Sequence, residues 1–205
     1  RVVRTLGVGW GATLREAIRH IHPASRPKLW VTSLMGGLTQ GIELNSFETA
    51  GELARRPHAH CAYLAAPIYA GSAESRDTLM AQDVFASSFA RIRSVETALV
   101  SLGDLSRRSL LIRHGLPGDV SVASLKEAGA VGDVLGHFLD AAGRPVAHPI
   151  NRRNPGNNLG LFAPNIEYRG EPDMADIAIP GNDDSMRSID LIVRELCAAV
   201  VEGKQ

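Results

Sequence analysis

The stretch Leu6–Leu14 constrains the fold most, because it combines a strand end, a glycine-rich turn and a helix start. A short apolar run precedes it, typical of a buried strand, and apolar residues then recur at helical spacing from Leu14 to Ile21. The three glycines between them let backbone N–H groups approach a bound group closely at the positive end of a helix. The turn is therefore either a tight connection that binds nothing or a binding site for a phosphate or a polyol hydroxyl.

The segment Gly7–Ala12 also matches the looser form of the dinucleotide-binding fingerprint. That fingerprint requires an acidic residue for the ribose roughly 20 residues further on, but no Asp or Glu occurs from Ala17 through Gly41. Arg26 or Lys28 could meet a 2′-phosphate, but both precede the second predicted strand instead of following it. We therefore expect no nicotinamide cofactor, and the sequence indicates no other cofactor.

Strand and helix patterns alternate along the first half of the chain. After the first strand we expect strands at residues 29–35, 61–66 and 97–102, with helical patterns between them. Such alternation requires crossover connections, so it predicts a Rossmann-like α/β fold, a parallel sheet with helices on both faces. Further on, the pattern predicts a short helix at residues 122–129 and a turn followed by a strand at residues 130–140.

The loops at the carboxyl ends of the predicted strands are the expected ligand-binding region. Three of these four loops are rich in glycine and small polar residues, which suits a small polar ligand; the loops are Gly9–Thr13, Gly36–Gln40, Pro67–Gly71 and Gly103–Arg108. They contain no paired carboxylates, no Ser-His-Asp spacing and no metal-ligand cluster. The sequence therefore favours binding over catalysis.

Composition limits the other possibilities. The chain has 205 residues with 44% hydrophobic content, enough for one substantial core, so we expect a single domain over residues 1–205. Its formal net charge is zero, which argues against a nucleic-acid-binding surface. Cys61 and Cys197 indicate neither a disulfide framework nor a zinc site, which fits a reducing cytoplasm. No apolar run approaches the length of a membrane span.

Several separate motifs carry a resemblance to a known family. They occur in consistent order between Leu6 and Arg152: LGVGWGATL, SLMGGLTQGIELNSFETAGELARR, LAAPIYAGSAESRDTLM, LVSLGDLSRRSLLIRHG and GAVGDVLGHFLDAAGRPVAHPIN. Together they resemble the effector-binding domain of SorC-type (DeoR-related) bacterial transcriptional regulators. Within that family, these motif sequences are most similar to those of regulators of polyol use, such as erythritol catabolism.

The resemblance implies a fold like that of sugar-phosphate isomerases and a function without catalysis. Domains of this kind bind a sugar, polyol or sugar phosphate as effector, form homo-oligomers and reach DNA through an N-terminal helix-turn-helix that this chain lacks. The alternative is an isomerase-like enzyme on the same scaffold, in which Asp133 would shuttle a proton. That enzyme would need a partner acid or lysine, and we find no second group at a strand's carboxyl end.

The resemblance also implies a set of ligand-binding residues. The first loop would hold a phosphate or hydroxyls, the glycine pair after the second strand would line the same pocket, and the acid of GAVGD would contact sugar hydroxyls. With the glycine that opens the fourth loop, the expected residues are Gly11, Ala12, Thr13, Gly36, Gly37, Gly103 and Asp133. Members that bind bisphosphorylated sugars carry an arginine where this chain has Met35, so a less charged ligand is implied.

Three other features each have two interpretations. Trp10 either stacks on a sugar face or belongs to the core. His58 and His60 have the spacing of a metal pair but no third ligand, so they are more simply surface histidines. A basic cluster either meets an anion at the sheet's carboxyl edge or forms a solvated loop; it comprises Arg107, Arg108, Arg113 and His114.

The C-terminal part departs from the family pattern. The polar segment 153–170 is an atypical loop or insertion, and the lysine that reaches the ligand in the family is missing, with Arg187 as a candidate replacement. The stretch Asp176–Gly203 instead resembles the end of the second small-subunit ribosomal protein of bacteria. Its pattern predicts a strand, a loop and an amphipathic helix.

Overall fold

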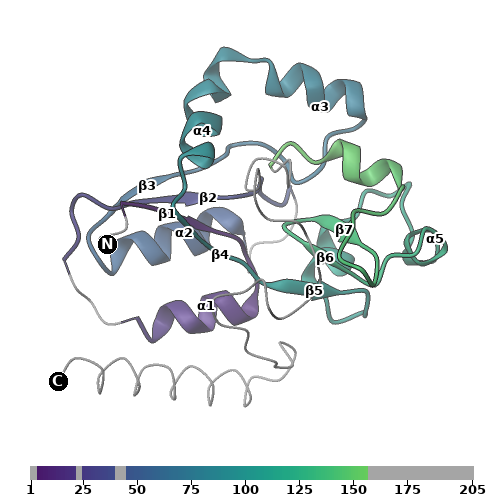
Figure 1. Cartoon of the computed structure of the whole chain (residues 1–205), viewed down its shortest axis with the longest axis horizontal. Coiled ribbons are helices and arrows are strands. Elements are labelled where there is room, and N and C mark those ends of the chain that lie inside the picture. The colour runs from purple at the N-terminus through teal and green to yellow at the C-terminus, as the bar shows by residue number, and fades with distance from the viewer. Residues whose placement is uncertain (1–3, 22–24, 40–44, 157–205) are drawn as a thin grey trace.

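The computed structural model describes residues 4–21, 25–39 and 45–156 of the chain. Four parallel strands form a sheet in the order β3-β2-β1-β4; they are β1 (Thr5–Val8), β2 (Trp30–Ser33), β3 (His60–Ala62) and β4 (Thr97–Leu99). Helices α1 and α2 lie on one face of this sheet and α4 on the other (Figure 1). The predicted Rossmann-like arrangement is therefore confirmed. The expectations for residues 157–205, including the strand, the helix and Arg187, lie outside the described residues.

Five α-helices accompany the strands in the described part of the chain. They are α1 (Ala12–Arg19), α2 (Ser46–Arg55), α3 (Ala73–Met80), α4 (Asp83–Arg93) and α5 (Val122–Glu127). Asn45 caps α2 by accepting a hydrogen bond from the backbone N–H of Phe47, and Ser72 caps α3 in the same manner. Such caps satisfy N–H groups that have no partner within the helix. Within the described ranges, no helix combines the length and apolar character needed to cross a membrane.

A second, three-stranded sheet corrects two expectations. Its strands β5 (Leu102–Asp104), β6 (Gly132–Val134) and β7 (His137–Leu139) are antiparallel in the order β5-β6-β7. The predicted fourth strand at residues 97–102 was therefore wrong in its extent, because the chain leaves the parallel sheet after β4 and enters the other sheet as β5. The single strand predicted within residues 130–140 is a hairpin, because Leu135 and Gly136 both adopt left-handed conformations and turn the chain back.

Three side-chain hydrogen bonds hold this hairpin turn. Leu135 has φ 52°, a conformation that costs a residue with a side chain about 1–2 kcal/mol. The Asn154 side chain donates to the Leu135 carbonyl at 2.9 Å, and the Tyr69 hydroxyl donates to the Gly136 carbonyl at 2.6 Å. The Gly136 N–H in turn donates to the Asp133 carboxylate at 3.0 Å. These bonds offset the strain and give the turn one conformation.

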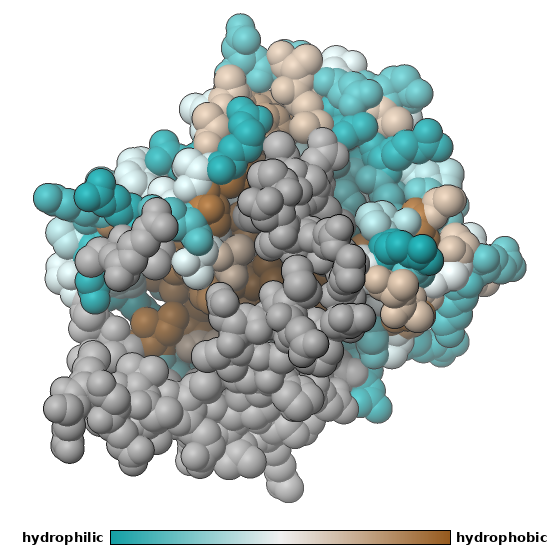
Figure 2. All heavy atoms as spheres, in the orientation of Figure 1, coloured by the Kyte–Doolittle hydropathy of each residue, from teal (hydrophilic) through white to brown (hydrophobic). Residues whose placement is uncertain are grey.

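Two apolar clusters form the core. The smaller one lies between the parallel sheet and helices α1 and α2, where Leu14 and Ile18 pack with Val8 and Val31. The larger one joins the two sheets; it includes Trp10, Leu34, Met35, Leu64, Phe89, Ile92, Leu111, Phe138 and Ile150, the last from the 3-10 helix η2 (Pro149–Arg153). Figure 2 shows hydrophilic side chains over the outer rim of the described surface and apolar ones toward its middle. The larger cluster holds the hairpin against the carboxyl edge of the parallel sheet.

Candidate functional site

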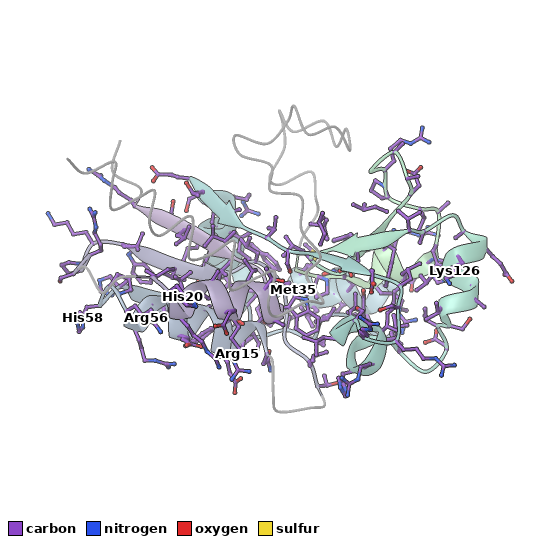
Figure 3. The ribbon with its side chains drawn as sticks, turned by 90° about the horizontal axis from the view of Figure 1, so that it is seen from below. Arg15, His20, Met35, Arg56, His58 and Lys126 are labelled. Carbon is purple, nitrogen blue, oxygen red and sulfur yellow. The ribbon has the colours of Figure 1, made fainter. Side chains whose placement is uncertain are left out.

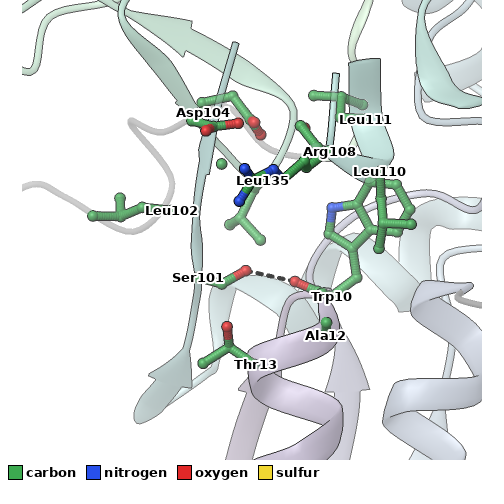
Figure 4. Close-up of a pocket in the computed structure, with 14 residues that line it drawn as sticks. Trp10, Ala12, Thr13, Ser101, Leu102, Asp104, Arg108, Leu110, Leu111 and Leu135 are labelled. Carbon is green, nitrogen blue, oxygen red and sulfur yellow. Dashed lines mark hydrogen bonds between the residues drawn. The ribbon is translucent and has the colours of Figure 1, made fainter. Parts of the chain in front are cut away.

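A small cavity lies where the β1–α1 loop, the segment from β4 to β5 and the β6–β7 hairpin meet (Figure 4). It encloses about 80 Å³. Since one water occupies roughly 30 Å³ in the liquid, this space admits a group the size of a phosphate or a short polyol fragment, with the rest of a ligand at the mouth. The residues that line it include Trp10, Gly11, Ala12, Thr13, Ser101, Gly103, Asp104, Arg108, Asp133 and Leu135.

The first loop contributes backbone groups. Helix α1 begins at Ala12 directly after Gly11, and no side chain caps it. Its first N–H groups therefore remain available to a ligand at the positive end of the helix. Gly11 has φ 130°, which residues with side chains rarely adopt, and an added Cβ would lie 2.9 Å from the Ser101 hydroxyl oxygen. Ser101 donates to the Trp10 carbonyl at 2.6 Å, and this bond ties the loop to the β4–β5 segment.

Asp133 forms part of the cavity wall and is 6% exposed. It pairs with Gly103 across the β5–β6 ladder, where a Cβ on Gly103 would collide with the Asp133 Oδ1 atom. The other carboxylate oxygen accepts the Gly136 N–H. Glycine at position 103 thus leaves room for the carboxylate, and the carboxylate both supports the hairpin turn and faces the cavity.

The charges around the cavity are mixed. Arg108 extends its guanidinium toward Asp104 and Leu135 (Figure 4), while Asp133 adds a second carboxylate to the lining. One arginine and two aspartates do not form a strongly anion-binding pocket, whereas hydroxyl groups can both donate to carboxylates and accept from arginine. The lining therefore suits a polyol, a sugar or a single phosphate better than a bisphosphate.

The structure brings together five of the seven expected residues and separates two. Gly11, Ala12, Thr13, Gly103 and Asp133 share the cavity just described, whereas Gly36 and Gly37 do not line it. The sequence reasoning missed Ser101 and Asp104 as lining residues. The available signal was their nearness to Gly103: Asp104 follows it within the predicted loop, and Ser101 lies two residues before it in the predicted strand.

The glycine pair is explained by packing against the loop that follows β3. A Cβ on Gly36 would collide with the carbonyls of Ala66 and Pro67, and the Gly37 N–H donates to the Ala66 carbonyl at 2.8 Å. Gly37 instead lines a second cavity of about 340 Å³, together with residues from 67–71 and 114–118 and Arg153. The glycines therefore permit close approach of two protein loops.

Met35 and the basic cluster are divided between the core and the two cavities. Met35 is fully buried in the larger apolar cluster. Arg108 lines the first cavity and His114 the second, whereas Arg107 and Arg113 line neither of them. Only part of the cluster is thus near a position where an anion could bind.

Tyr69 connects the two cavities. Tyr69 lines the second cavity, and its hydroxyl donates a hydrogen bond to the Gly136 carbonyl of the hairpin turn. Leu135, the neighbouring residue of that turn, lines the first cavity. Burial raises the pKa of Tyr69 well above its ordinary value, and the nearby Asp133 carboxylate raises it further, while Arg153 opposes the shift. The phenol therefore stays protonated and remains a hydrogen-bond donor over the ordinary pH range.

Two of the open interpretations receive an answer. Trp10 is 6% exposed, belongs to the larger core and also lines the cavity, so core packing and ligand contact are compatible. His58 is exposed, and His60 stacks on Trp30 with ring centroids 4.6 Å apart. Within residues 4–21, 25–39 and 45–156, no three His, Cys, Asp or Glu residues come together as metal ligands.

Comparisons with known proteins agree with this fold. The family described as "Putative sugar-binding domain" matches residues 3–165, and the ribosomal protein S2 family matches residues 165–203, which lie beyond the part of the chain that the structure describes. The erythritol catabolism regulatory protein EryD of Brucella abortus is 28% identical over 139 residues, which cover 68% of this chain and 44% of that protein. The chain thus spans less than half the length of this relative.

Two solved structures share the fold. A DeoR family transcriptional regulator from Listeria monocytogenes has a TM-score of 0.70 and 24% identity, over 78% of this chain and 63% of that one. The full-length sorbitol operon regulator SorC from Klebsiella pneumoniae has a TM-score of 0.68 and 18% identity, over 78% and 53% of the two chains. The resemblance stated from the motifs is confirmed by the family match and the Brucella relative, and these two structures agree with it in fold.

Proposed function

The chain belongs to the sugar-binding domain family of DeoR- and SorC-type regulators, and we propose that it senses a small sugar, polyol or singly phosphorylated sugar in the cavity beside Asp133. Binding there would shift a transcriptional regulator of sugar or polyol catabolism between two states, through different affinities of the ligand for those states. The name of the Brucella relative makes erythritol the first polyol to test.

One observation carries this proposal. Three segments far apart in sequence, around Thr13, Gly103 and Asp133, meet at one cavity at the carboxyl edge of the parallel sheet. Ligands of open α/β sheets bind at this edge. The three segments offer backbone N–H groups, hydroxyls and a carboxylate, the set that recognises a hydroxylated molecule.

The charge of the lining sets the expected ligand class. With Arg108 balanced by Asp104 and Asp133, a second phosphate would find no further cation among the residues that line the cavity. The buried thioether of Met35 supplies none either. We therefore expect a neutral or singly charged ligand.

A thermal-shift screen tests this expectation. The panel contains erythritol, xylitol, sorbitol, a pentose phosphate and a hexose bisphosphate. The proposal expects stabilisation by at least one polyol or monophosphate, since a ligand that binds the folded state raises the melting temperature. It expects no stabilisation by the bisphosphate, and a large shift with that compound alone would contradict the assignment of ligand class.

Matched variants locate the binding. Asp133→Asn keeps an oxygen that can accept the Gly136 N–H but removes the charge, so it should weaken the response to the ligand more than it lowers stability. Glu127→Gln removes one carboxylate from the exposed end of α5 and serves as the control. Aldose–ketose conversion of the pentose phosphate would support the isomerase alternative and contradict a purely sensing function.

A further inference from the structure

Basic side chains gather at the edge of the parallel sheet opposite the candidate site. At this edge helices α1, α2 and α4 end and the four parallel strands begin. Counting described residues alone, the last turns of these helices and the segments leading into the strands hold eight Arg or Lys residues and three Glu. The whole chain has 22 residues of each charge. The exposed members form what we term the basic edge: Arg4, Arg19, Arg26, Lys28, Arg55 and Arg93.

Among the described residues, most members of the basic edge have no ion pair. Arg19 forms an ion pair with Glu16 at 2.8 Å. Within the described part of the chain, it is the one member of the basic edge that does so. Glu96, the acid in front of β4, accepts a hydrogen bond from the backbone N–H of Arg4 at 2.7 Å. The side chains of Lys28 and Arg93 have no acidic partner within the described part of the chain.

Helix ends explain only part of the pattern. Cations near a helix C-terminus complement the helix dipole, which accounts for Arg19, Arg55 and Arg93. Arg26 and Lys28 lie in the segment before β2, outside any helix. The positive charge therefore extends beyond what the helices need, and its extent points to a partner with repeated negative charges.

We propose that the basic edge binds the phosphate backbone of duplex DNA without reading its sequence. Several exposed Arg and Lys side chains at one edge of the sheet can each neutralise a phosphate of a polyanion, and release of counterions from DNA drives such binding. The choice of DNA among polyanions rests on the proposed function in a transcriptional regulator. The zero net charge of the chain had argued against such a surface. That value is a sum over the whole chain, in which the positive charge of the basic edge is cancelled by an excess of Asp and Glu elsewhere.

The test measures binding of the full chain to a short fluorescent DNA duplex of random sequence by anisotropy, over a series of salt concentrations. Wild-type protein should bind at low salt, with an affinity that falls steeply as salt rises. In the double variant Lys28→Gln and Arg93→Gln, the slope of log affinity against log salt should decrease by about one unit for each phosphate that is no longer neutralised.

A matched control removes the same charges at a distant place. Lys126 and Arg152 are exposed, and Figure 3 shows Lys126 at the end of the molecule opposite to Arg56 and His58. The double variant Lys126→Gln and Arg152→Gln should keep the wild-type slope. Melting curves of both double variants establish that each one is folded.

Three outcomes would overturn the proposal. The first is absence of DNA binding by the wild-type protein at low salt, and the second is equal slopes for the two double variants. The third uses labelled polyglutamate as a second probe. If the wild-type protein binds polyglutamate as tightly as it binds the DNA duplex, and the Lys28 and Arg93 double variant binds both more weakly to the same extent, the basic edge would be assigned to an acidic polypeptide. None of these readouts depends on an effector, so they can fail or succeed independently of the thermal-shift screen.

Discussion

The hairpin turn beside the cavity gives the sharpest stability prediction, because one buried side chain binds a backbone group of the turn and a second backbone group just after η2. Asn154 is 2% exposed. Its amide donates to the Leu135 carbonyl at 2.9 Å, and its carbonyl oxygen accepts the Gly156 N–H at 2.8 Å. Asn154→Ala leaves both backbone groups without these partners, and Leu135 keeps its strained left-handed conformation.

The expected cost follows from these two groups. A buried polar group left without a partner costs about 1–3 kcal/mol, so with two such groups the variant should lose roughly 2–6 kcal/mol of unfolding free energy. For a chain of this size each kcal/mol lowers the melting temperature by about 2–4 °C. We therefore expect the melting temperature to decrease by roughly 4–24 °C.

Thermal unfolding followed by circular dichroism measures this decrease, with Gln82→Ala as the matched control. Gln82 is exposed, and its side-chain amide donates to the Thr78 carbonyl at 3.1 Å, so its removal should change the melting temperature little. If Asn154→Ala melts within about 2 °C of the wild type, the turn does not depend on this side chain and the reasoning is refuted.

Two further predictions concern the same region. Gly103→Ala places a Cβ against the Asp133 carboxylate, so this variant should lose the stabilisation by ligand. Gly118→Ala is the control, because a Cβ there meets nothing within 4 Å, and it should keep the stabilisation. An unchanged response of the Gly103 variant would contradict the site. Because the pKa of Tyr69 is raised, the unfolded chain ionises above pH 10.0 before the folded one, and stability should fall by about 1.4 kcal/mol per pH unit from there. In Tyr69→Phe this decrease should be smaller, and what remains comes from Tyr63 and Cys61, whose pKa values are also raised. Urea unfolding at about pH 8 and about pH 11 can measure the difference, and equal decreases in both proteins would count against it.

The parallel sheet could be predicted from the sequence because its signals are local. Apolar runs ended by Gly or Pro alternate with helical spacing, and such alternation leaves few topologies. The first loop was found for the same reason, since Gly11 lies directly between a strand and a helix. Features that depend on the contents of one short segment were therefore accessible.

The second sheet was not accessible, because its formation depends on partners distant in sequence. Residues 97–102 read as one apolar strand, but its two ends pair with different strands, Val8 opposite Leu99 and Val134 opposite Leu102. The hairpin turn contains Leu135, a residue that gives no turn signal, and it is stabilised by Asn154 and other remote side chains. Tertiary contacts thus override local preference at this point.

The glycine pair illustrates a limit of a different kind. Adjacent glycines indicate that something approaches the backbone closely, but the sequence does not say what. At Gly36 the approaching atoms are the carbonyls of Ala66 and Pro67, where a ligand was expected. Only the arrangement of the two loops in space distinguishes these cases.

The central claim is that the segments around Thr13, Gly103 and Asp133 form one binding site, and amide chemical-shift mapping by NMR tests it most directly. The titrant is the polyol or monophosphate that gives the largest thermal shift. The claim predicts concerted shifts at these three segments and none at Glu48 or Arg55, which line a separate surface hollow between α1 and α2. Shifts confined to that hollow, or to the second cavity around Gly37, would contradict it.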